Sequence, residues 1–129
     1  MAFVDDDEWP EPGWLSALLR TQREYGADIV AGPSVPIYEP PEVDWIVKGG
    51  FFERPRFATG TRLDNARTSN VLIASRVLEA IDPAFDDRFG MTGGEDTHFF
   101  ARARRAGRRT PDQSPRARAT RSARCSCGR

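Results

Sequence analysis

The chain has 129 residues, of which 39% are hydrophobic, with two cysteines and one histidine. This length suits one modest domain, and no apolar run approaches the roughly 20 residues of a membrane-spanning helix. The net charge is zero, but residues 1–100 hold 18 acidic and nine basic side chains, whereas residues 101–129 hold ten arginines and one aspartate. The acidic body favours metal-dependent chemistry over nucleic-acid binding.

The first third of the chain predicts a strand, an acidic loop, a helix and a second strand. Residues 2–4 are apolar and run into four acids at 5–8, as a buried strand does at a polar edge. Apolar residues at helical spacing begin at Trp14, and Gly26 is a natural stop for that helix. Residues 28–31 form the next short apolar strand. This order is typical of an α/β layer.

The stretch 33–67 predicts little regular structure, because it holds five prolines among scattered aromatics. Such stretches are uncommon inside a compact domain and are commonly lids or binding loops, although a loosely packed connector fits equally well. A third apolar strand follows at 70–73 and a short helix at 76–81. Apolar residues at helical spacing predict a last helix at 95–106.

Residues 110–129 contain no Leu, Ile, Val or Phe and repeat Arg with Ala, Ser and Pro. This composition is typical of disorder. We therefore expect a folded domain at 1–109 and a disordered, arginine-rich tail at 110–129. Arginines attract nucleic acid electrostatically, but the tail lacks interleaved aromatic residues. Cys125 and Cys127 have no second pair to complete a zinc site.

The acids after the first strand are one candidate site. Alternate residues at an extended strand end point to one side, so we expect Asp5 and Asp7 to share a face. Carboxylate oxygens suit Mg²⁺ or Mn²⁺, and ligands of open α/β sheets bind outside the carboxyl ends of strands. A solvated acidic loop that caps the following helix is the alternative.

Glu95 and Asp96, which open the last predicted helix, are the second candidate site. Free backbone N–H groups at a helix start favour the ionised form of both acids. Asp96 shares the apolar face of Phe99 and Phe100, and there it can accept a proton from a bound hydroxyl. Glu95 is rotated about 100° from Asp96 and is better placed to orient neighbours. Acids in a first turn also serve simply as partners of the helix dipole.

The order and spacing of several short segments are more specific than any one of them. The segments are Ala2-Phe3-Val4-Asp5-Asp6-Asp7-Glu8, Gly13-Trp14-Leu15, Gly26-Ala27-Asp28-Ile29-Val30-Ala31-Gly32-Pro33, Thr68-Ser69-Asn70-Val71-Leu72-Ile73, Phe85-Asp86, Arg88-Phe89-Gly90 and Thr92-Gly93-Gly94-Glu95-Asp96-Thr97-His98-Phe99-Phe100. Together they resemble the family-2 glycosyltransferases of GT-A fold and the related galactosyltransferase C-terminal region. The resemblance implies a partial, truncated GT-A fold (nucleotide-diphospho-sugar transferase-like), a three-layer α/β domain at 1–109. We expect the acceptor-side, C-terminal portion, because the family's N-terminal nucleotide-binding half has no counterpart before the first strand.

The resemblance also implies roles for the acids. Asp5 and Asp7 look like the DxD motif, which contacts the donor ribose and holds Mn²⁺ or Mg²⁺ on the sugar-nucleotide diphosphate. Asp96 resembles the catalytic base that deprotonates the acceptor hydroxyl for a single inverting displacement, and Glu95 resembles its acidic partner. The implied reaction is sugar transfer from a nucleotide-diphosphate sugar to a saccharide or lipid-linked acceptor in cell-wall or polysaccharide biosynthesis.

Two other functions stay open on the residues alone. One is another Mg²⁺-dependent phosphoryl or phosphodiester enzyme, in which carboxylates converge on a metal pair about 3.5–4 Å apart. The other is a non-catalytic module whose basic tail binds nucleic acid or acidic lipid. For the glycosyltransferase we expect no nucleic-acid partner and a cytoplasmic location, with full-length relatives attached peripherally to the inner face of the membrane.

Overall fold

The computed structural model describes residues 1–38, 44–90, 92–109, 112–113 and 119–122. Its elements, in chain order, are β1 (Ala2–Val4), β2 (Glu8–Pro10), α1 (Trp14–Tyr25), β3 (Ile29–Ala31), β4 (Ser34–Ile37), α2 (Asp44–Gly49), β5 (Asn70–Ile73), α3 (Ser75–Ala80), the 3₁₀ helix η1 (Asp87–Phe89), α4 (Glu95–Arg105), β6 (Asp112–Gln113) and β7 (Ala119–Ser122). The predicted strands at 2–4, 28–31 and 70–73 are confirmed, as are the helices that begin at Trp14 and near Glu95.

The main sheet has the strand order β1-β5-β3-β6. Strand β5 runs antiparallel to both of its neighbours, β1 and β3, while β6 runs parallel to β3. Val4 at the end of β1 lies opposite Asn70 at the start of β5, and Ala31 at the end of β3 lies opposite Val71. The carboxyl ends of β1 and β3 therefore meet the amino end of β5 at one edge of the sheet.

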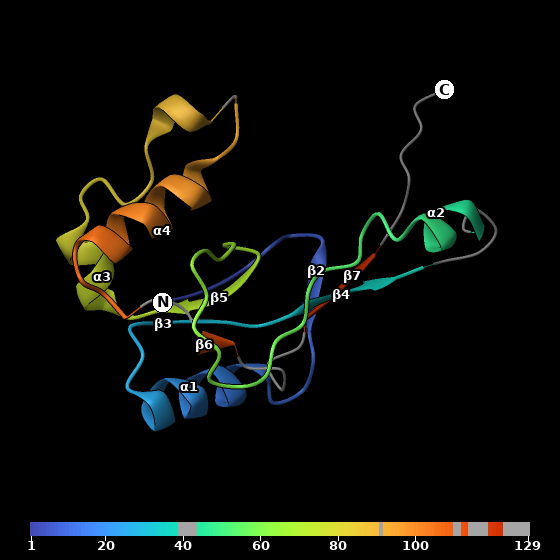
Figure 1. Cartoon of the computed structure of the whole chain (residues 1–129), viewed down its shortest axis with the longest axis horizontal. Coiled ribbons are helices and arrows are strands. Elements are labelled where there is room, and N and C mark those ends of the chain that lie inside the picture. The colour runs from blue at the N-terminus through green and yellow to red at the C-terminus, as the bar shows by residue number, and fades with distance from the viewer. Residues whose placement is uncertain (39–43, 91, 110–111, 114–118, 123–129) are drawn as a thin grey trace.

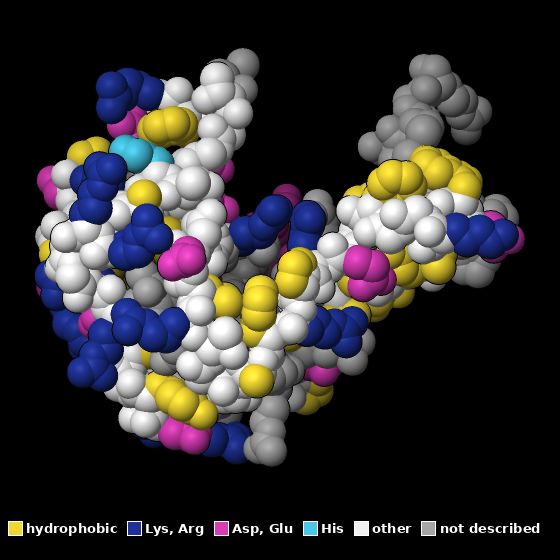
Figure 2. All heavy atoms as spheres, in the orientation of Figure 1, with side chains coloured by type: hydrophobic (Ala, Val, Ile, Leu, Met, Phe, Trp, Pro, Cys, Tyr) yellow, Lys and Arg dark blue, Asp and Glu magenta, His cyan; other side chains and the backbone are white. Residues whose placement is uncertain are grey.

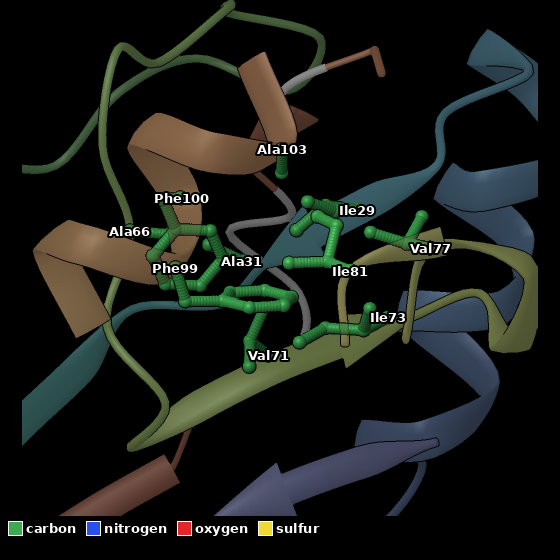
Figure 3. Packing of buried hydrophobic residues seen from close by; sticks show 10 residues of the cluster. All are labelled: Ile29, Ala31, Ala66, Val71, Ile73, Val77, Ile81, Phe99, Phe100 and Ala103. Atoms are coloured by element: carbon green, nitrogen blue, oxygen red, sulfur yellow. The ribbon is translucent and has the colours of Figure 1, made fainter. Parts of the chain in front are cut away.

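Helices cover both faces of this sheet, with α1 on one side and α3 and α4 on the other (Figure 1). Side chains alternate along each strand, so Ile29 and Ala31 pack on the α4 side while Val30 packs on the α1 side. The α4-side cluster consists of Ile29, Ala31, Ala66, Val71, Ile73, Val77, Ile81, Phe99, Phe100 and Ala103 (Figure 3). The α1-side cluster consists of Ala17, Leu18, Ala27, Val30 and Leu72. The central strands are thus buried on both faces.

Two adjacent phenylalanines anchor α4 to the sheet. Phe99 and Phe100 are both 0% exposed, and Phe99 points from α4 toward Val71 of β5 (Figure 3). The ring centroid of Phe99 lies 5.2 Å from that of Phe85 and 5.1 Å from that of Phe100. Gly94, at the N-cap, has a φ of 100°, a conformation that favours glycine. The start of α4 is therefore fixed relative to the edge of the sheet.

The stretch 33–67 is more regular than we predicted. It contains β4 and α2, and β4 belongs to a second sheet with the order β2-β7-β4. Proline fits into β4 because this strand lies at the edge of its sheet, where a missing N–H removes no ladder bond. Together β4, β7 and α2 extend away from the main sheet as an arm (Figure 1).

Two segments of the range 110–129 also differ from the predicted disorder. Strand β6 pairs with β3 in the main sheet, and β7 lies between β2 and β4 in the second. Composition reflects the burial of side chains, whereas strand pairing uses backbone donors and acceptors that every residue except proline supplies in full. The rest of the range, including Cys125 and Cys127, lies outside the described residues, and a domain boundary at 109 stays a prediction.

Asp28 ties the start of β3 to two later parts of the chain. Its Oδ1 accepts a hydrogen bond from Arg76 Nε at 2.7 Å, and its Oδ2 accepts one from the backbone N–H of Arg109 at 2.8 Å. Burial raises the pKa of Asp28, but the bonds from Arg109 and Arg76 outweigh this effect and hold the pKa below its usual 3.8. The stabilisation is therefore present above about pH 4 and is lost as pH falls through the lower, folded-state pKa.

We expect Asp28→Asn to lower the free energy of unfolding by about 1–3 kcal/mol near pH 7, because charge-assisted hydrogen bonds are lost. Near pH 3 the difference from the parent should shrink, and urea unfolding at both pH values measures this. Asp64→Asn is the matched control, since the side chain of Asp64 is 98% exposed and its ion pair with Arg104 is solvated. A loss that is equal at both pH values contradicts the role of the charge.

Candidate functional site

A cavity of about 430 Å³ lies at the edge where β1, β3 and β5 meet. Four carboxylates line it: Asp5, Glu8, Glu95 and Asp96. Two acidic clusters that lie far apart in the sequence, 5–8 and 95–96, therefore share one cavity, except that Asp6 and Asp7 are not among its lining residues. On the face shown in Figure 2, the surface is hollowed between the α4 end and the arm, and acidic and basic side chains border the hollow.

Residues 5–8 form a turn, and our expectation of an extended strand end is wrong. The backbone N–H of Glu8 donates to the carbonyl oxygen of Asp5 at 3.1 Å, which closes the turn. The N–H of Asp5 donates to the carbonyl of Ser69, just before β5, at 3.2 Å. The turn leads the chain from β1 into β2, so Asp5 and Asp7 do not alternate along a strand. Asp5 faces the cavity, and both side chains are half-buried.

Thr68 holds the carboxylate of Asp96. Its hydroxyl donates to Oδ1 at 2.8 Å, and its backbone N–H donates to Oδ2 at 3.2 Å. Each carboxylate oxygen has two lone pairs, so both oxygens keep capacity for a further donor. Asp96 is therefore fixed in position and still able to accept a proton or a hydrogen bond from a ligand.

Glu95 also lines the cavity and has one unpaired carboxylate oxygen. Its Oε2 is buried and has no hydrogen-bond partner among the described residues. An unsatisfied buried acceptor costs about 1–3 kcal/mol, so a ligand that donates a hydrogen bond here relieves that penalty.

Glu8 and Thr68 are site residues to which the sequence analysis gave no role. Glu8, in β2, is only 6% exposed, and its Oε2 accepts a hydrogen bond from Ser34 Oγ in β4 at 3.1 Å. The signal that could have revealed Thr68 was the direction of β5. Once β5 is antiparallel to β1, the residues just before it lie beside the acids that follow β1.

Buried Asn70 connects α1 to the wall of the cavity through two hydrogen bonds. Its Nδ2 donates to the carbonyl of Pro33 at 3.1 Å, and its Oδ1 accepts from the indole Nε1 of Trp14 at 2.7 Å. Pro33 lines the cavity, and Trp14 begins α1. One amide therefore links the helix on one face of the sheet to the wall of the site.

The carboxylates suit a divalent cation that a substrate phosphate also ligates. Among the described residues, no group of three or more His, Cys, Asp or Glu side chains could hold a metal by itself. Mg²⁺ is commonly bound by one or two carboxylates together with substrate phosphates. Asp5 on the cavity wall, with Asp7 in the same turn, fits such a shared site.

In the described part of the chain, no helix is long and apolar enough to cross a membrane.

Comparison with known proteins assigns the family. The profile of glycosyl transferase family 2 matches residues 1–112. The chain belongs to glycosyl transferase family 2. The succinoglycan biosynthesis protein ExoM of Rhizobium meliloti (strain 1021) is 37% identical over 101 residues, which are 78% of this chain and 32% of that relative. The chain thus spans about a third of the length of the curated relative it matches. No solved structure matches.

Family membership confirms the resemblance to family-2 glycosyltransferases that was based on the short sequence segments, including both acidic clusters. The range matched by the glycosyl transferase family 2 profile includes both acidic clusters, Thr68 and all of the main sheet except the last residue of β6. The mixed α/β architecture, with helices on both faces of a short-stranded sheet, is consistent with a domain of this family.

Proposed function

We propose that this chain carries the acceptor side of an inverting glycosyltransferase of GT-A fold, which moves a sugar from a nucleotide-diphosphate sugar to a hydroxyl of a saccharide acceptor. The observation that carries the proposal is the shared cavity. Asp5 lies far from Glu95 and Asp96 in the matched range 1–112, yet all three line one site of about 430 Å³. That volume lies within the range of small-molecule sites.

In this proposal Asp96 is the base. The acceptor hydroxyl gives its proton to the Asp96 carboxylate while its oxygen forms a bond to the anomeric carbon of the donor sugar. The bond from that carbon to the diphosphate oxygen breaks at the same time, so the configuration inverts and the electron pair leaves with the diphosphate. Thr68 keeps the base in place through its two hydrogen bonds, and Glu95 accepts a hydrogen bond from the acceptor.

Asp5 and Asp7 are the residues that we assign to Mn²⁺ or Mg²⁺. When bound, the cation offsets the charge of the leaving diphosphate. The support for this assignment is the donor set: hard oxygen ligands in one turn at the carboxyl end of β1, of which Asp5 lines the same cavity as the proposed base.

We expect Asp5→Ala and Asp7→Ala to weaken Mn²⁺ binding in the presence of a nucleoside diphosphate by about tenfold or more, since each removes a proposed ligand. Isothermal titration of the whole chain measures the affinity. Asp6→Ala, a neighbouring exposed acid of the same turn, is the matched control and should bind as the parent does. Parent-like affinity of Asp7→Ala removes Asp7 from the metal site.

The stereochemistry of the product tests the reaction class. A panel of sugar nucleotides and saccharide acceptors is screened for release of nucleoside diphosphate, and the anomeric configuration of the product is read by NMR. Inversion is expected, because a single base and no covalent intermediate are invoked. A product of retained configuration contradicts the proposal.

The name of the relative supports a role in polysaccharide biosynthesis. A lipid-linked acceptor, a cytoplasmic location and attachment to the inner face of the membrane stay predictions.

The alternative of a two-metal phosphoryl or phosphodiester enzyme needs several carboxylates on one metal pair. The described residues offer no cluster of three or more potential ligands, and the family match favours glycosyl transfer.

A further inference from the structure

Arg67 is an uncommitted basic side chain on the wall of the acidic cavity. It directly precedes Thr68, the residue that holds Asp96, and it is exposed. Within the described part of the chain, its guanidinium takes part in no hydrogen bond or ion pair. The other arginine of the cavity, Arg54, does have an interaction partner. The cavity wall therefore includes one arginine that has no partner among the described residues and that directly precedes the residue holding the proposed base.

Within the described part of the chain, no carboxylate of the same cavity forms an ion pair with Arg67. Asp96 is bound by Thr68 and Glu8 by Ser34, while the buried Oε2 of Glu95 has no partner among the described residues. Because the acidic side chains and Arg67 line one cavity without contacting each other, a ligand can bind to both. A neutral saccharide donates hydroxyl hydrogens to the carboxylates but gives a guanidinium no charged partner. The arrangement indicates a ligand that has hydroxyls and also an anionic group.

We propose that Arg67 binds a phosphate group of the substrate in the cavity that Asp96 also lines. This inference rests on the proposed function and adds a phosphate contact to it. A planar guanidinium donates two parallel hydrogen bonds to phosphate oxygens, which makes arginine well suited to such a contact. The phosphate belongs either to the donor diphosphate or to a lipid-diphosphate-linked acceptor, and separate probes distinguish these two sources.

The test is a titration of the whole chain with two kinds of diphosphate in the presence of Mn²⁺. Nucleoside diphosphates (UDP, GDP and dTDP) represent the donor, and farnesyl diphosphate represents a lipid-linked acceptor. We expect Arg67→Ala to weaken binding of one kind by about 10–100-fold, the range for a lost charge-assisted contact. Arg67→Lys should restore part of that affinity, because it keeps the charge but loses the bidentate geometry.

Arg62→Ala is the matched control, since Arg62 is also exposed and has no partner among the described residues but does not line the cavity. Its affinity for both probes should stay within about twofold of the parent. The dependence of binding on salt should fall for Arg67→Ala and not for Arg62→Ala, because a phosphate contact is screened by ions.

A loss confined to nucleoside diphosphates assigns Arg67 to the donor, and a loss confined to farnesyl diphosphate assigns it to the acceptor. Equal affinity of Arg67→Ala and the parent, or a parent that binds neither probe, overturns the inference. The proposed function is judged separately by Asp96→Asn. If that variant loses transfer while Arg67→Ala binds normally, only the inference about Arg67 fails. If Asp96→Asn transfers normally while Arg67→Ala binds weakly, the proposed base fails instead.

Discussion

Replacing Asp96 by Asn is expected to lower the rate of sugar transfer by about 10²–10⁴-fold, the usual contribution of a general base. The amide keeps the shape of the side chain, and its oxygen still accepts a hydrogen bond from Thr68, but it takes no proton from the acceptor. Donor affinity should stay within about twofold of the parent, because Asp96 is proposed to act on the acceptor hydroxyl and the contacts that bind the donor are unchanged. Release of nucleoside diphosphate, followed against acceptor concentration, separates kcat from KM.

Two further variants sharpen this result. Asp64→Asn makes the same chemical change at an exposed side chain outside the cavity and should leave transfer unchanged. Thr68→Val removes the hydroxyl that binds Asp96 Oδ1 but keeps the backbone N–H that binds Oδ2. It should give an intermediate loss, because the base remains but is less firmly held. Full activity of Asp96→Asn rules out this residue as the base.

Replacing Phe99 by Ala is expected to lower the free energy of unfolding by about 3–5 kcal/mol, as buried aromatic truncations do. Phe99 is 0% exposed and packs between α4 and the sheet, with Phe85 and Phe100 as ring neighbours. The loss is a large part of the 5–15 kcal/mol that typically separates folded from unfolded domains. Because Phe99 anchors the helix that begins with Glu95, this variant should also lose ligand binding at the cavity.

Urea unfolding followed by circular dichroism measures the stability change. Phe51→Ala is the matched control, because the same side chain is 62% exposed there, and its effect should stay below about 1 kcal/mol. Phe99→Leu should fall between the two, since it fills part of the space. Equal destabilisation by Phe99→Ala and Phe51→Ala contradicts the packing described for α4.

The core elements were predictable because their side chains are apolar where the structure buries them. The strand at 28–31 was predicted from its short apolar run, and α4 was predicted from phenylalanines at helical spacing. Both patterns consist of the residues that the structure buries. The second sheet was not predictable in this way. The proline in β4 argued against a strand, although Val35 of this strand is buried, and β7 contains Thr, Arg and Ser, which give it no hydrophobic signature.

The candidate site was predictable in its residues but not in its geometry. Asp5, Glu95 and Asp96 were identified by motif and by the chemistry of carboxylates, and the structure brings them to one cavity. The extended backbone expected for Asp5 and Asp7 is replaced by a hydrogen-bonded turn, and of the two only Asp5 lines the cavity. Thr68 was missed because the direction of a short, fully buried strand cannot be inferred from its own residues.

The insertion of β5 between β1 and β3 also sets when the site can form. Asp5 directly follows β1, and within the described part of the main sheet β1 pairs only with β5, whose residues follow some 65 positions later. Glu95 and Asp96 emerge later still. Pairings between distant parts of a chain carry a loop-closure cost that slows folding. Strand β1 therefore cannot take its place in the main sheet until β5 has been synthesised, and the site is complete only after Glu95 and Asp96.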